Sequence, residues 1–72
     1  MTTEEKLRIL KGWTKSFAIE TSAVGEYFIL ARFHRELNPY QSGLYESSTD
    51  LINDTYSRFK LMIWQLIRNE LY

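Results

Sequence analysis

The first part of the chain has the spacing of an amphipathic helix. Apolar side chains recur every three or four residues and share one side of a helical wheel: Leu7, Leu10, Trp13 and Phe17. Three basic residues, Arg8, Lys11 and Lys15, fall on nearly the opposite side. Thr2 and Glu5 have the spacing of a capping box, which marks a helix start. The pattern therefore predicts a helix over residues 3–20.

The next segment, residues 23–37, shows no strict alternation of apolar and polar positions, and it ends in good helix formers. We predict a second helix there. Its apolar residues occupy two sides of the wheel, because Ile29 and Phe33 face away from the side that holds Leu30 and His34. A buried strand over Glu26 to Phe33 is the alternative.

Residues 19–26 contain β-branched residues, a serine and a glycine, all of which are poor helix formers. We therefore expect a break between the first two helices. One continuous helix over residues 3–37 is the competing interpretation, but it could not bury its apolar stripe without a second chain.

The last third of the chain carries the clearest helical pattern. Six apolar residues fall within about 100° of the wheel: Ile52, Tyr56, Phe59, Ile63, Leu66 and Ile67. Ser48, Thr49 and Asp50 are all suitable N-cap residues, and Pro39 disfavours helix at the residue before it. We predict a third helix over residues 49–71, after an exposed connection that contains Tyr40 and Tyr45.

Together these segments predict an all-α fold, in which residues 1–72 form a single small domain of three helices. The chain has 72 residues, of which 44% are hydrophobic, and no cysteine. So short a chain builds a thin core, and disulfides cannot reinforce it. We therefore expect the domain to complete its core by dimerisation.

Charge and composition narrow the classes of function. Nine basic and nine acidic residues cancel, so no net charge draws the protein to nucleic acid or to an anionic membrane. The N-terminus carries acids where a signal peptide would carry lysines, and the longest apolar run is far too short to span a bilayer. These features favour a cytoplasmic protein without membrane contact.

The residues that catalysis needs are scarce. Nucleophilic cysteine is absent, His34 is the only candidate histidine base, and the three glycines lie too far apart for a phosphate-binding loop. No acid, base and nucleophile can be named as a set. We therefore predict a protein that is not an enzyme, with no cofactor, no metal site and no small-molecule substrate.

What the sequence does offer is apolar surface beyond the core stripes. Clustered aromatic and aliphatic side chains that remain in water usually mark a contact surface. The candidate partner-binding residues lie on the second sides of the last two helices and in the loop between them: Ile29, Phe33, Tyr40, Tyr45, Leu61 and Trp64. Compact packing of the three helices, which would cover most of these side chains, is the competing explanation.

We therefore expect a protein–protein interaction module, such as an adaptor, inhibitor or regulator, that binds a second copy of itself or a larger protein. Its size and lack of catalytic residues would suit a phage or mobile-element protein. A small DNA- or RNA-binding regulator is the alternative, with Arg8, Lys11 and Lys15 as the phosphate contacts. The zero net charge does not favour that alternative.

Overall fold

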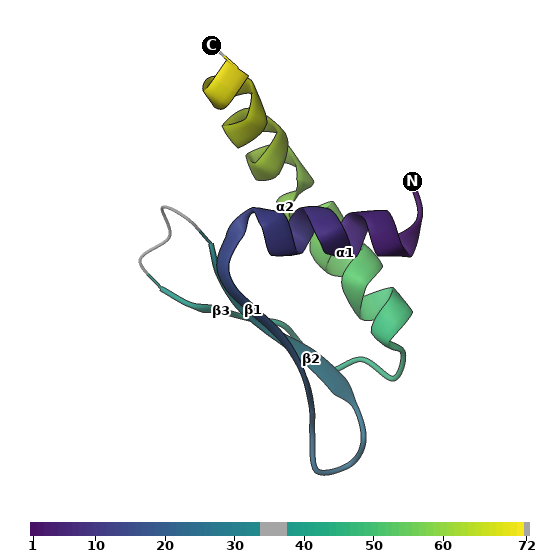
Figure 1. Ribbon diagram of the computed structural model, residues 1–72. Helices are drawn as coiled ribbons and strands as arrows, with labels where there is room; N and C mark the ends of the chain where they lie inside the picture. The colour runs from purple at the N-terminus through teal and green to yellow at the C-terminus, as the bar shows by residue number, and fades with distance from the viewer. Residues whose placement is uncertain (34–37, 72) are drawn as a thin grey trace.

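The computed structural model describes residues 1–33 and 38–71, and Figure 1 shows how its elements are arranged. The order along the chain is helix α1 (Thr3–Gly12), strand β1 (Thr14–Thr21), strand β2 (Tyr27–Phe33), strand β3 (Tyr40–Gln41) and helix α2 (Ser48–Leu71). The strands form one antiparallel sheet in the order β1-β2-β3. The fold is therefore α+β, and the predicted all-α bundle of three helices is wrong.

Helix α1 begins where the capping box predicted, because the Thr2 hydroxyl accepts a hydrogen bond from the Glu5 amide at 3.1 Å. It ends eight residues earlier than predicted, at Gly12. The Thr14 hydroxyl donates to the carbonyl oxygens of Leu10 and Lys11, which lack helical partners at the end of the helix. The chain then continues as β1 instead of as helix.

The second predicted helix is also wrong, because residues 27–33 form β2; its last four predicted residues, 34–37 with His34, lie outside the described part of the chain. The strand considered as the alternative is confirmed. Burial alternates along β2, with Ile29, Ala31 and Phe33 buried and the residues between them exposed. This period of two is the signature of a sheet with one covered face.

The predicted break between the first two helices is the turn of a β-hairpin. The Gly25 amide donates to the Ser22 carbonyl at 3.0 Å, and the Ser22 amide donates to the Glu26 carbonyl at 2.7 Å. Gly25 has a φ of 86°, a left-handed conformation that glycine adopts without steric cost. The residues that disfavour helix here therefore form a tight reversal that pairs β1 with β2.

Strand β3 has only two residues, and Ser42 extends its hydrogen bonding. The Ser42 amide donates to the Ile29 carbonyl at 3.0 Å, and the Ser42 hydroxyl accepts from the Ile29 amide at 2.8 Å. Farther along, the Tyr45 amide donates to the Tyr27 carbonyl, and the Tyr27 amide donates to the Tyr45 carbonyl. The chain thus stays attached to β2 until it reaches α2.

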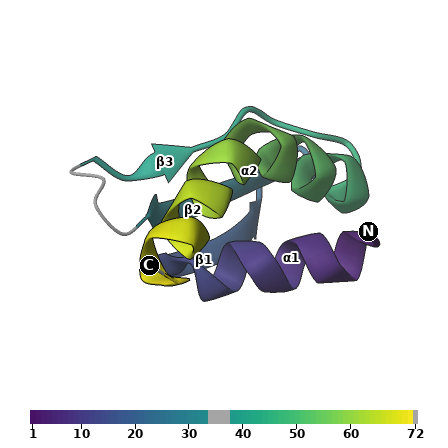
Figure 2. The same ribbon diagram turned by 90° about the horizontal axis from the view of Figure 1, so that it is seen from above.

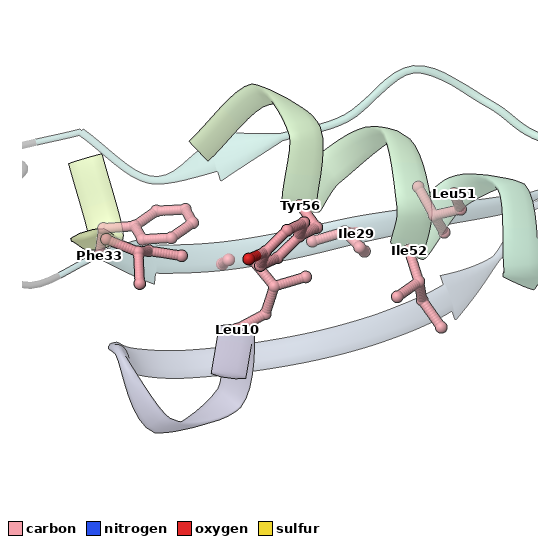
Figure 3. Packing of buried hydrophobic residues seen from close by; sticks show 8 residues of the cluster. Leu10, Ile29, Phe33, Leu51, Ile52 and Tyr56 are labelled. Carbon is pink, nitrogen blue, oxygen red and sulfur yellow. The ribbon is translucent and has the colours of Figure 1, made fainter. Parts of the chain in front are cut away.

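Helix α2 matches the third predicted helix to within one residue at its start. Both helices lie on one side of the strands, as Figure 1 shows and Figure 2 shows from above. The core fills the space between the helices and the sheet (Figure 3), and its buried apolar residues are Leu10, Ile29, Ala31, Phe33, Leu51, Ile52, Tyr56 and Ile63. Because both helices and β2 contribute to this cluster, one copy has a core of its own. The predicted dimerisation stays a prediction.

Candidate functional site

Among the side chains of α2 that the structure describes, two large apolar ones are exposed, Leu61 and Trp64. On a wheel of 100° per residue, Leu61 lies about 160° from both Phe59 and Ile63, which face the core. Leu61 is accordingly 71% exposed, and Trp64, one turn farther on, is 49% exposed. The yellow half of α2 in Figure 1 also extends beyond α1 and beyond the strands.

Two cations share this face. Lys60, Trp64, Arg68 and Leu61 fall within about 100° of the wheel, and all four are exposed. We call these four residues the α2 patch. The sequence has no acidic residue between Asp54 and Glu70, so no carboxylate of this part of α2 neutralises the two cations. The α2 patch therefore combines an aromatic and an aliphatic side chain with local positive charge.

Two of the predicted partner-binding residues do not lie on the surface. Ile29 is 0% exposed and Phe33 is 1% exposed. The ring of Phe33 packs on Phe59 with a centroid distance of 4.2 Å. These side chains appeared to form a second apolar side only because a helical wheel was applied to a strand.

The two predicted tyrosines of the connection contact α2. Tyr40 packs edge-on against Phe59 at 4.8 Å between centroids, and the Arg58 guanidinium lies 5.5 Å from the centre of its ring. Tyr45 hydrogen bonds to the Asp54 carboxylate, and this bond, together with burial and the Asp54 charge, raises the pKa of the Tyr45 phenol. Both residues are half-buried and hold the connection against α2.

The three cations of the nucleic-acid alternative are exposed but do not share one helix. Arg8 and Lys11 lie on α1, whereas Lys15 lies on β1, at the irregularity in the pairing between Thr14 and Ser16. The structure therefore does not bring them together as the helical strip that the sequence suggested.

Among residues 1–33 and 38–71, no three histidine, cysteine, aspartate or glutamate side chains come close enough to hold a metal ion. Within the same described residues, no helix combines the length and apolar character that crossing a bilayer requires.

Of the six predicted partner-binding residues, Leu61 and Trp64 are the two that the structure brings together on an exposed face. The flanking Lys60 and Arg68 were not predicted from the sequence, although the absence of acidic residues between Asp54 and Glu70 could have indicated them. A comparison with known protein families, curated proteins and solved structures finds no match for this chain.

Proposed function

We propose that the protein is a non-enzymatic protein–protein interaction module that binds a larger protein through the α2 patch. The observation that carries the proposal is the exposure of Leu61 and Trp64, which lie about one helical turn apart on the exposed side of α2. Exposed tryptophan and leucine on one helix face are the usual anchors when a helix binds in a groove of its partner.

The cations define the chemistry of the partner. Lys60 and Arg68 flank the two apolar side chains, and the stems of both residues extend the apolar surface while their charges reach solvent. A complementary partner surface is an apolar recess with acidic side chains around its rim. Because the chain has no cysteine and cannot form disulfides, we infer that this interaction takes place in the cytoplasm. Such a protein would act as an adaptor, inhibitor or regulator.

The test uses a photoreactive amino acid placed at Leu61 or at Trp64 in cells of the source organism. Leu44, which is 54% exposed and lies outside α2, is the matched control position. We expect a cross-linked protein from positions 61 and 64 and none of the same mass from position 44. The captured protein is then purified, and its affinity for the module is measured by calorimetry.

In that second step, Leu61→Arg and Lys60→Glu should each weaken binding at least about tenfold, since hot-spot and charge contacts have effects of this size. Leu44→Ala should leave the affinity unchanged. Equal affinity of wild type and Leu61→Arg would refute the proposal. So would binding of wild-type protein, but not Leu61→Arg, to phosphatidylserine vesicles without any protein adduct, because the patch would then contact lipid.

A further inference from the structure

The unpaired edge of β1 has backbone groups and side chains that complement those of a second, antiparallel β1. Strand β1 lies at one edge of the sheet, and β2 occupies its other side. The Ile29 amide and carbonyl bond to Ser42 on the β3 side, so the neighbouring residues Phe28 and Leu30 direct their backbone groups toward β1. Their register partners, Glu20 and Ala18, therefore point toward β2.

The residues between those positions direct their backbone groups away from the sheet. They are Phe17, Ile19 and Thr21, and none of their amides or carbonyls takes part in the loop and turn hydrogen bonds of the described chain. Such an edge is a template for another strand. Phe17 and Ile19 are also only half-buried, so a strand paired here would cover further apolar surface.

The uncovered face of the sheet, which we call the outer face, has a defined order of charges. Register places Glu20 beside Phe28, Ala18 beside Leu30, and Ser16 beside Arg32. Glu20 and Arg32 are both exposed, but four residues of strand separate their rows, which is about 13 Å. Within one copy these two charges are therefore too far apart to pair.

We propose that two copies of this chain pair antiparallel along β1 and form a continuous six-stranded sheet. With Phe17 opposite Ile19 of the second copy, the outward backbone groups of both strands meet, and Ala18 lies opposite its own counterpart. The outer face then has an apolar central row in which Leu30 and Ala18 of one copy meet the same two residues of the other.

The same register brings Glu20 of one copy close to Arg32 of the other. Glu20 of each copy lies opposite the small Ser16 of the other copy. In that other copy, Ser16 pairs with Arg32 on β2. The two Cα atoms are then two strand spacings apart, about 10 Å, which the long arginine and the glutamate can bridge across a serine. Twofold symmetry makes this contact twice. A shift by two residues would place Glu20 beside Ala18 and Leu30 instead, so the charges select the register.

The position of α1 decides where the helices lie in this pair. Helix α1 leads directly into Thr14 and lies across that end of β1 (Figure 1). Because the strands are antiparallel, the two copies of α1 lie at opposite ends of the strand pair. The outer faces of both copies join on one side of the new sheet, and all four helices lie on the other.

Analytical ultracentrifugation of the full chain over a range of concentrations tests the pairing, with circular dichroism to check that each variant is folded. Glu20→Arg places two arginines at each contact, and Arg32→Glu places two glutamates there, so each variant should raise the dimer dissociation constant about tenfold. The double variant restores opposite charges and should return the constant to within about twofold of wild type. Lys11→Glu, at an exposed charge on α1, and Leu61→Arg, in the α2 patch, should have no effect.

The double variant is decisive because the two residues cannot pair within one copy, so a recovery reports a contact between copies. A monomer at every concentration would overturn the proposal. A dimer dissociation constant that neither single substitution changes, or that the double variant raises further, would overturn it too, since the copies would then meet elsewhere. Because Leu61→Arg is outside β1, failure of this pairing leaves the function proposed for the α2 patch intact.

Discussion

At the scale of single residues, the Ser42 hydroxyl supplies the hydrogen bond that a longer β3 would supply through its backbone. It accepts from the Ile29 amide at 2.8 Å and donates to the Gly43 carbonyl at 2.9 Å. Ile29 is fully buried, and an unsatisfied buried amide costs about 1–3 kcal/mol. One hydroxyl therefore permits a strand of two residues where the chain must turn toward α2.

Tyr45, which also lies between β3 and α2, makes a side-chain contact with Asp54. The Asp54 carboxylate accepts its hydrogen bond, which favours the neutral phenol and raises the pKa of Tyr45 above its usual value of about 10. A group whose pKa is higher in the folded state stabilises the fold below the unfolded pKa and loses that contribution as the pH rises through the folded pKa. We expect Asp54→Asn to lower the pKa of Tyr45, and the difference in unfolding free energy between wild type and this variant to narrow above about pH 10.

The measurement is an NMR titration of protein that contains ring-labelled tyrosine, with urea unfolding at several pH values. Asp50→Asn is the matched control, because Asp50 lies one helical turn earlier on α2, is exposed, and does not perturb Tyr45. An unchanged Tyr45 titration in Asp54→Asn would show that the carboxylate does not hold the phenol in solution.

At the scale of elements, the β1–β2 hairpin depends on Gly25. A residue with a Cβ atom pays about 1–2 kcal/mol for the left-handed conformation that Gly25 adopts. We therefore expect Gly25→Ala to lower the free energy of unfolding by that amount, as measured by urea denaturation. A Cβ atom at this position would meet no other atom within 4 Å, so crowding cannot be the cause.

Gly12→Ala provides a control of opposite sign. Gly12 is the last residue of α1, does not have a positive φ, and likewise has open space around an added Cβ atom. Alanine in a helix is favoured over glycine by roughly 0.5–1 kcal/mol, so this variant should be more stable than wild type. Destabilisation by both substitutions would mean that the hairpin turn differs from the one described.

The elements also show which structure the sequence could predict. Helix α2 was predictable because its 24 residues keep one period throughout, and the start of α1 was predictable from the Thr2 cap. Leu7, Leu10 and Trp13 do follow a helical spacing, but Phe17 continues it only by coincidence, since β1 has already begun. The strands depend on pairing between distant residues, which a local pattern of apolar positions does not contain.

A candidate residue could be predicted only where the helix or strand that carries it was predicted correctly. Leu61 and Trp64 were identified because the α2 wheel was correct, and that wheel places them away from the core stripe. Ile29 and Phe33 were assigned to a surface because a helical period was applied to a strand, where residues two apart share a face. Errors in secondary structure therefore passed directly into the list of candidate residues.

At the scale of the whole molecule, the fold is two layers thick and narrow. Its extent along the shortest principal axis is 15 Å, and eight apolar side chains make up its buried core. A domain of this length has a typical stability of roughly 4–11 kcal/mol. Each core side chain therefore supports a large share of the total.

Phe33→Ala should remove a large share of that stability, because truncation of a buried phenylalanine costs about 3–5 kcal/mol. Leu61→Ala should change the free energy of unfolding by less than about 0.5 kcal/mol, since Leu61 is 71% exposed. Thermal unfolding followed by circular dichroism compares the two variants. Similar stability of both would contradict the placement of β2 in the core.

The two edges of the sheet differ, and the difference sets a limit on polymerisation. Among residues 1–33 and 38–71, β3 has only two paired residues, and the Ile29 amide already donates to the Ser42 hydroxyl. The edge at β1 is longer, and a twofold pairing uses it completely in both copies. In the part of the chain that the structure describes, the sheet edge left over is then only the two residues of β3, so pairing through β1 forms a closed dimer and does not propagate into a fibre.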